Sequence, residues 1–185
     1  PIKCFYWRIR MIKDVLKMGE PLLASAAEPI KDFDTPFLRN LIKDLHDTQR
    51  ERSGVGIAAP QIGVSKRVII VGFDQHNERY RTQKPVPVVV LINPEFQPVS
   101  DEMIDGWEGC LSVPGLRGLV PRYHEIKYTA CSPQGEKIAG SAKDFHARII
   151  QHECDHLNGV LFPQRINDLC NFGFEDALHN RQNYQ

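Results

Sequence analysis

The sequence has 185 residues, of which 42% are hydrophobic and 25% are charged, a composition typical of one globular domain with a substantial core. Its 23 basic and 23 acidic side chains cancel, which argues against a nucleic-acid-binding surface or a polybasic membrane anchor. No stretch reaches the roughly 20 apolar residues of a membrane-spanning helix. We therefore predict a single domain over residues 1–185, with no nucleic-acid and no membrane partner.

The five cysteines, at positions 4, 110, 131, 154 and 170, are an odd number without a Cys-x-x-Cys pair. This usage argues against a disulfide framework and favours a reducing compartment. The first ten residues contain no apolar run of signal-peptide length. We interpret residues 1–11 as a short extension or remnant and residues 172–185 as a weakly patterned tail.

The N-terminal third predicts an extended arm followed by a helix. Residues 12–28 are interrupted by Gly19 and Pro21, which favours an extended arm packed on the body. Thr35 and Pro36 suit an N-cap and the first helical position, and apolar residues then recur at helical spacing. This pattern predicts an amphipathic helix over residues 36–51.

Residues 53–63 read Ser-Gly-Val-Gly-Ile-Ala-Ala-Pro-Gln-Ile-Gly. They lack the third glycine of a dinucleotide fingerprint and the lysine of a phosphate loop, so nucleotide binding is not indicated. Small residues before Gln61 suit a backbone that lies against an extended ligand while the Gln61 amide donates a hydrogen bond. A tight turn carrying a surface glutamine fits the same residues, and their chemistry alone leaves both interpretations open.

Apolar, β-branched runs predict strands at residues 68–73 and 86–92, the second ended by Asn93 and Pro94. Three more short strands are predicted, the last two as a hairpin around residues 132–135: residues 116–120, 124–130 and 136–140. Hairpin connections dominate and helices lie towards the two ends of the chain. We therefore predict an α+β fold, with mostly antiparallel sheets packed around a helix in the C-terminal half and a second helix near the N-terminus.

The stretch Gln151-His152-Glu153-Cys154-Asp155-His156 lies within residues 147–159, which have no proline and end in a glycine, as expected for a helix. The apolar residues of this segment are Ala147, Ile149, Ile150 and Leu157. Two histidines four residues apart project from one face of a helix, so both can bind one metal ion. Glu153 can then accept a proton from a water that the ion activates. A structural alternative is that His152 and His156 are core histidines bonded to backbone.

A catalytic site of this type needs a third protein ligand and an open position. Cys110 is the candidate, because Gly109 lets the backbone fold tightly beside it and Leu111 would place an N–H next to the metal. Cys154 is expected to point away from the two histidines. A lone cysteine is often a small buried hydrophobe, and residue chemistry alone leaves that alternative open for Cys110.

Three stretches, residues 54–61, 108–112 and 151–156, resemble the signature motifs of peptide deformylase in order and approximate separation. The resemblance spans roughly residues 15–165. It implies a metal-dependent hydrolase that removes the formyl group from the N-terminal formylmethionine of newly made polypeptides and releases formate.

By matching position, the resemblance implies that Cys110, His152 and His156 bind the metal. It implies that Glu153 transfers protons, and that Gln61 and the backbone N–H of Leu111 hold the developing oxyanion. Gly56 and Gly109 would pair through their backbones with the peptide, Arg148 and Ile149 would line the methionine pocket, and Arg117 and Glu108 would support binding. The full set of implied substrate-binding residues is Val55, Gly56, Glu108, Gly109, Arg117, Arg148 and Ile149.

Histidine and thiolate ligands suit zinc by coordination chemistry alone. The resemblance instead implies one Fe²⁺ per chain as the usual ion, with Zn²⁺, Ni²⁺ or Co²⁺ able to replace it. Its implied partners are nascent N-formylmethionyl polypeptides. Some family members contact the ribosome through a basic C-terminal helix, but residues 172–185 carry only Arg181 against Glu175 and Asp176. The bacterial cytoplasm is the expected location, and an organelle is the alternative, although no transit signal is seen.

Two other functions compete. In a zinc metallopeptidase the third histidine of the longer motif would fall at Phe162, so Glu175 would have to be the third ligand. In a non-catalytic peptide-binding module the metal would be structural, but structural sites are usually closed and leave an adjacent glutamate without a role.

Overall fold

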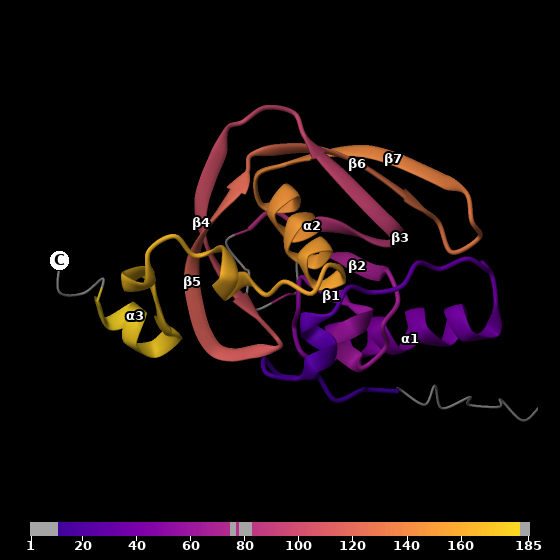
Figure 1. Cartoon of the computed structure of the whole chain (residues 1–185), viewed down its shortest axis with the longest axis horizontal. Coiled ribbons are helices and arrows are strands. Elements are labelled where there is room, and N and C mark those ends of the chain that lie inside the picture. Colours follow the sequence, from indigo (N-terminus) through magenta and orange to yellow (C-terminus); the bar gives the residue numbers. More distant parts are fainter. Residues whose placement is uncertain (1–10, 75–76, 78–82, 182–185) are drawn as a thin grey trace, which may run out of the picture.

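Two antiparallel sheets enclose one central helix (Figure 1). The computed structural model describes residues 11–74, 77 and 83–181. The larger sheet has the strand order β1-β2-β3-β6-β7 and the smaller one the order β4-β5-β8. The strands are β1 Gly56–Ala58, β2 Val68–Phe73, β3 Val86–Pro98, β4 Met103–Cys110, β5 Val113–Tyr123, β6 Glu125–Cys131, β7 Lys137–Lys143 and β8 Phe172–Phe174.

Helix α2, Asp144–Leu157, contacts β1, β2 and β7 of the larger sheet and β5 of the smaller one. Figure 1 shows it in the middle of the molecule, and α1, Pro36–Glu51, lies near β1 and β2. A short helix, α3 Glu175–Arg181, follows β8. The predicted α+β class is confirmed.

Helix α1 has the bounds that its sequence predicts. Thr35 caps it by accepting a hydrogen bond from the N–H of Leu38 at 3.2 Å, and Pro36 opens it. The apolar stripe is buried, with Leu38 and Leu45 fully enclosed. This helix therefore covers the face of β2 that points away from α2.

The position of strand β2, which is covered on both faces, explains why its six residues are nearly all apolar. Successive side chains of a strand point to opposite faces, and both faces of β2 are covered. Ile69 and Val71 pack with α2 residues, whereas Val68 and Ile70 pack with α1 residues. A strand buried on both sides needs apolar residues on both faces, so the short uninterrupted run was a reliable signal.

Several predicted strands differ in extent from the observed ones, and β4 was missed. Strand β3 continues past Asn93 and Pro94, because a register shift between Ile92 and Glu95 accommodates them. Asn93 has φ of 51°, and its side-chain amide is bonded to the N–H and C=O of Ile30, each at 2.8 Å. Strand β4 was not predicted at all, because Gly106, Glu108 and Gly109 interrupt any alternating pattern.

The predicted hairpin is present, since β6 and β7 pair antiparallel on either side of residues 132–135. The three strands predicted in this region all end later than predicted: β5 covers Val113–Tyr123, β6 Glu125–Cys131 and β7 Lys137–Lys143. The β4–β5 pairing, with Trp107 opposite Leu119 and Cys110 opposite Val113, forms most of the smaller sheet. The β4–β5 hairpin brings Cys110 towards α2.

The arm at residues 12–28 has no α-helix, and its irregular backbone is broken by a turn at Met18 and Gly19 and by one turn of 3-10 helix at Pro21–Ala24. It bonds to two of the three motif segments and to the residue that follows the third. The N–H groups of Leu16 and Met18 donate to the carbonyls of Gln61 and Ser112 at 2.8 and 2.7 Å, and Ala27 donates to Leu157 at 2.9 Å. The arm therefore ties together the segments that build the candidate site. Residues 1–10 and 182–185 lie outside the described residues.

Candidate metal centre

The histidines lie near the C-terminal end of α2, on adjacent turns of one face. Their ring centroids are 5.0 Å apart. Asn158 ends the helix, and Gly159 adopts the expected left-handed backbone, with φ of 73° and its N–H donating to the His156 carbonyl at 3.3 Å. Their side-chain partners are Cys110 and Glu108, which argues against two core histidines bonded to backbone.

Cys110 ends β4 and faces the two histidines. Its Sγ lies 3.2 Å from Nε2 of His156, and candidate ligand atoms of Cys110, His152 and His156 all lie within 4.8 Å of one another. These three side chains could hold a metal ion. Cys154 faces the core instead, as predicted, and burial raises its pKa to about 12.

The donor set fits a divalent transition metal. The nearby imidazoles hold the pKa of the Cys110 thiol well below its usual range, despite the opposing effect of burial. A thiolate and two imidazoles are soft to intermediate ligands, typical of zinc or ferrous iron rather than magnesium or calcium. Three protein ligands leave a tetrahedral ion one position for water or substrate.

Glu108 fixes the orientation of His152. Its Oε2 lies 2.9 Å from Nδ1 of His152, which leaves Nε2 of that ring available as a ligand. Arg122 holds the same carboxylate in a two-point contact, at 2.9 and 3.0 Å. Burial opposes ionisation of Glu108, but the hydrogen bonds from His152 and Arg122 keep its pKa far below normal. Glu108 lines the pocket, so its predicted role in substrate binding stays a prediction, and its carboxylate is bonded to His152 and Arg122.

Arg122 also connects Glu108 to α2. Its Nη1 donates to Oδ2 of Asp155 at 2.5 Å, and Arg165 donates to the two oxygens of Asp155 at 2.7 and 3.1 Å. Arg122, Glu108 and Asp155 are each no more than 5% exposed. A buried ionic network therefore joins the β4–β5 hairpin to the helix that carries the histidines. Arg122 and Asp155 were not predicted as site residues, because no local pattern marks a long-range ion pair.

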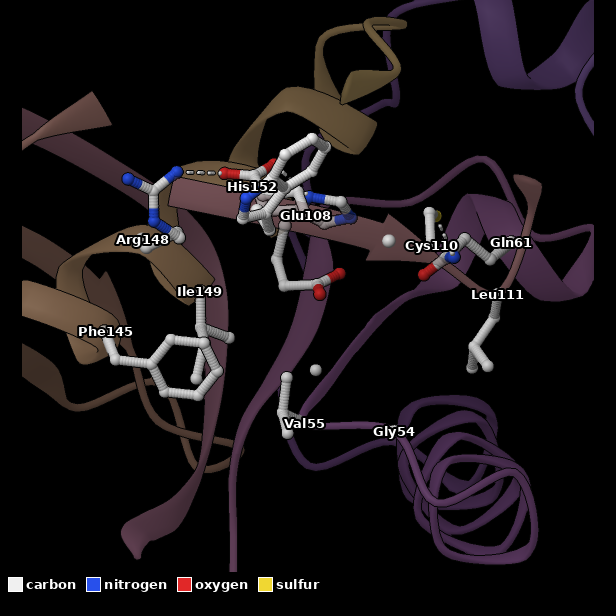
Figure 2. Close-up of a pocket in the computed structure, with 14 residues that line it drawn as sticks. Gly54, Val55, Gln61, Glu108, Cys110, Leu111, Phe145, Arg148, Ile149 and His152 are labelled. Carbon is white, nitrogen blue, oxygen red and sulfur yellow. Dashed lines mark hydrogen bonds and ion pairs between the residues drawn. The ribbon is translucent and has the colours of Figure 1, made fainter. Parts of the chain in front are cut away.

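Arg148 extends this network from the first half of α2. Its guanidinium donates to Oε1 of Glu108 at 2.8 Å and to the backbone carbonyls of Ile104 and Val120 at 2.5 and 2.7 Å. Figure 2 shows its charged end directed at Glu108. Arg148 lines the pocket, as predicted, but its charged group is bonded to β4 and β5.

Glu153 lies beside the candidate ligands and is 4% exposed. Burial raises the pKa of its carboxyl to about 7, against the lowering effect of the two histidines. Its Oε2 has no hydrogen-bond partner among the described residues. A carboxyl with a pKa near neutrality can both accept and return a proton, which suits general acid–base chemistry.

Two of the candidate ligands, Cys110 and His152, border a pocket between the two sheets. In Figure 2, the Gln61 amide lies beside Cys110, while Phe145 and Ile149 lie at the other end of the pocket. Its lining residues are Gly54, Val55, Gly56, Gln61, Trp107, Glu108, Gly109, Cys110, Leu111, Phe145, Arg148, Ile149, His152 and Glu153. Trp107 and Phe145 were not predicted as site residues, although Phe145 shares a helical stripe with Ile149.

Arg117 is the one predicted site residue that neither lines this pocket nor belongs to the candidate ligand group. It pairs with Glu175 at 2.7 Å and lines a neighbouring cavity. Glu175, the third ligand of the metallopeptidase alternative, is thus bonded to Arg117 and is not one of the three grouped donors.

Both walls of the pocket include the edge strand of a sheet. Within the described chain, β1 is the first strand of the larger sheet and β4 the first strand of the smaller one. Residues of both strands line the pocket, including Gly56 from β1 and Gly109 from β4. Edge strands have one side free of ladder hydrogen bonds, so an extended peptide can bond to them.

Comparison with known proteins decides the family. The profile of the family described as polypeptide deformylase matches residues 12–172. The chain belongs to this family. It is 54% identical to peptide deformylase 1 of Bordetella pertussis over 168 residues, which cover 91% of this chain and 95% of that protein.

Solved structures of the family have the same fold. A Met-Ala-Ser-bound class I type b peptide deformylase from Acinetobacter baumannii aligns with a TM-score of 0.81 and 44% identity. The alignment covers 85% of this chain and 100% of that chain. The enzyme from Thermotoga maritima aligns with a TM-score of 0.75 and 34% identity, over 85% and 99% of the two chains.

As a member of this family, the chain is a metal-dependent enzyme that removes the N-formyl group from nascent N-formylmethionyl polypeptides. The metallopeptidase and the non-catalytic module are thereby set aside. None of the helices in residues 11–74, 77 and 83–181 is both long and apolar enough to cross a membrane.

The ionic network yields a stability prediction. We expect Arg122→Met to lower the free energy of unfolding by about 3–5 kcal/mol, because it leaves the buried Glu108 without its two-point partner. Arg39→Met is the matched control, since it breaks the exposed pair with Asp34 and should cost less than about 1 kcal/mol. Urea unfolding of both variants measures the difference, and equal costs would contradict a structural role for the network.

Proposed function

We propose that hydrolysis of the formyl group takes place at Cys110, His152 and His156, which together hold one metal ion, with Glu153 as the proton-transfer group. The observation that carries this proposal is the convergence of the three donors within 4.8 Å beside a buried carboxyl. When bound, the ion lowers the pKa of a water molecule and polarises the formyl carbonyl.

We propose Fe²⁺ as the ion in the cell, with Zn²⁺, Ni²⁺ or Co²⁺ able to replace it. The thiolate and imidazole donors support iron and zinc about equally, so the preference for iron rests on the family resemblance. A ferrous centre with a thiolate ligand is open to oxidation at both iron and sulfur. The iron form should therefore lose activity in air, whereas the zinc form should not.

The substrate is proposed to bind as an added strand between the edges of β1 and β4. Backbone groups at Gly56 and Gly109 would pair with the extended peptide. The methionine side chain would enter the apolar part of the pocket, formed by Val55, Phe145 and Ile149. The Met-Ala-Ser peptide bound to the related A. baumannii enzyme supports a methionine-first ligand in this fold.

Gln61 and the N–H of Leu111 are proposed to stabilise the oxyanion. The Gln61 side chain is fixed in one orientation, because its Oε1 accepts a hydrogen bond from the N–H of Ala58 at 2.9 Å. Its Nε2 therefore faces Ser112 Oγ at 3.1 Å and Cys110 Sγ at 3.5 Å. An amide donor held in place before the reaction stabilises developing charge without reorganisation.

Glu153 is proposed to take a proton from the attacking water and return it to the leaving amine. The water oxygen bonds to the formyl carbon, the carbon–nitrogen bond breaks, and formate and a free amino terminus result. A carboxyl with a pKa near 7 serves both transfers at neutral pH. Its burial excludes bulk water from the proton that it holds.

We further propose the bacterial cytoplasm as the place of action, where nascent formylated chains are available. Helix α3 begins with Glu175 and Asp176, so its first turn is acidic. Contact with ribosomal RNA through a basic helix at this end of the described chain is therefore not part of the proposal.

The direct test is formate release from a formylmethionyl peptide by the full chain. We expect activity that is lost with a chelator and restored by Fe²⁺ under argon, and that decays in air only for the iron form. Formate release that survives chelation, with metal removal verified by elemental analysis, would contradict the proposed metal dependence.

Glu153→Ala should retain one metal ion per chain and lower kcat by about 10²–10⁴-fold, because it removes the proton-transfer group but none of the donors. Metal content by elemental analysis and formate release measure the two effects. Normal turnover in this variant would remove Glu153 from its role.

Cys110→Ser should abolish tight metal binding, because a neutral hydroxyl replaces the thiolate donor. Glu175→Gln, which loses only its pair with Arg117, should bind metal normally. Titration of metal-free protein with Zn²⁺ compares them. The reverse outcome would transfer the third ligand to Glu175.

A further inference from the structure

Gly56 is the first residue of β1, where glycine is an unfavourable choice. Glycine weakens a strand because it has no side chain to pack and is entropically costly to order. Its backbone does not explain its presence, because the described glycines with positive φ are Gly19, Gly63, Gly72, Gly115, Gly135 and Gly159. Pairing of Gly56 with Val71 of β2 is also open to any residue.

The space around Gly56 does explain it. A Cβ atom at this position would overlap Oε1 of Glu153 and lie 2.8 Å from its Cδ and 2.9 Å from its Cγ. Three consecutive atoms of one side chain thus occupy the volume that any other residue would need. Glu153 is 4% exposed, so an added Cβ at position 56 would have to displace its carboxylate within the pocket.

We infer that Gly56 is a positioning residue for Glu153. The Glu153 carboxylate occupies the volume that a side chain at position 56 would fill. The inference rests on the proposed role of Glu153 in proton transfer. It is distinct from the backbone pairing with substrate, because alanine keeps the same N–H and C=O groups.

The two roles of Gly56 predict different kinetics. In Gly56→Ala the added Cβ displaces the Glu153 carboxylate from this volume. A displacement of about 1 Å in a reacting group can lower the rate by about 10²-fold. We expect kcat to fall by about that factor while KM for a formylmethionyl peptide changes less than about threefold. Metal content should stay at one ion per chain, since none of the donors is changed.

A double-mutant cycle on thermal unfolding tests the contact without any assay of activity. Gly56→Ala should lower the midpoint by several degrees in the original background. It should lower the midpoint by a similar amount in the Glu153→Gln background, because glutamine has an atom at each position that overlaps the added Cβ. With Glu153→Ala the overlap is gone, and Gly56→Ala should leave the midpoint unchanged or raise it.

Gly173→Ala is the matched control, because Gly173 also lies in a three-residue strand but an added Cβ would lie 3.7 Å from Leu178. It should change neither kcat nor the midpoint appreciably. Equal destabilisation by Gly56→Ala in the Glu153→Gln and Glu153→Ala backgrounds would overturn the inference. So would an unchanged kcat in Gly56→Ala. If the original protein released no formate, the proposed function would fail while the unfolding cycle still reported on the contact.

Discussion

The buried ionic contact between Glu108 and Arg122 holds the two halves of the site together. Glu108 lies on β4, Arg122 on β5, and Arg122 continues to Asp155 on α2. Cys110 follows Glu108 by two residues on the same strand, and His152 is bonded to Glu108 directly. The Glu108 carboxylate, bonded to Arg122, Arg148 and His152, therefore sets the distance between the Cys110 thiol and the histidines of α2.

This network orients the residues of the site more than it adds to the free energy of folding. Burying a carboxylate and a guanidinium costs desolvation energy that their attraction only partly recovers. An apolar contact could join the hairpin to the helix at lower cost, but it would neither orient His152 nor keep a negative charge behind it. The hydrogen bond from Nδ1 to a carboxylate makes an imidazole a stronger ligand, which is a function that packing alone does not supply.

The sequence predicted best what depends on local patterns. Thr35 and Pro36 define the start of α1, and the spacing of His152 and His156 places them on one face of α2. Their pairing with Cys110 could not be derived in this way, because it depends on β4, whose glycines and charges hide the strand. Residue chemistry named Cys110 only as a candidate, and the family resemblance decided for it, since a recurring motif preserves the outcome of a tertiary contact.

Some roles were predicted incompletely because they depend on tertiary contacts. Glu108 and Arg148 were assigned to substrate because they lie in or near recognised motifs, yet their charged groups are bonded to each other and to the strands. A motif indicates that a residue matters but does not show which way its side chain points. Arg122 had no local signal at all, since a single arginine in an apolar strand becomes informative only when its partners are known.

The pocket combines two opposite demands on nearby residues. The donors must be rigid, and Glu108, itself held by Arg122, fixes His152 through a hydrogen bond to its Nδ1. For the proposed proton transfer, the Glu153 carboxyl must instead be free to exchange protons, and its Oε2 has no hydrogen-bond partner among the described residues. A buried carboxyl without a partner is costly, and its raised pKa is the sign of that cost. Shape rather than hydrogen bonding can hold such a group, because packing against Gly56 restricts its position without binding its proton.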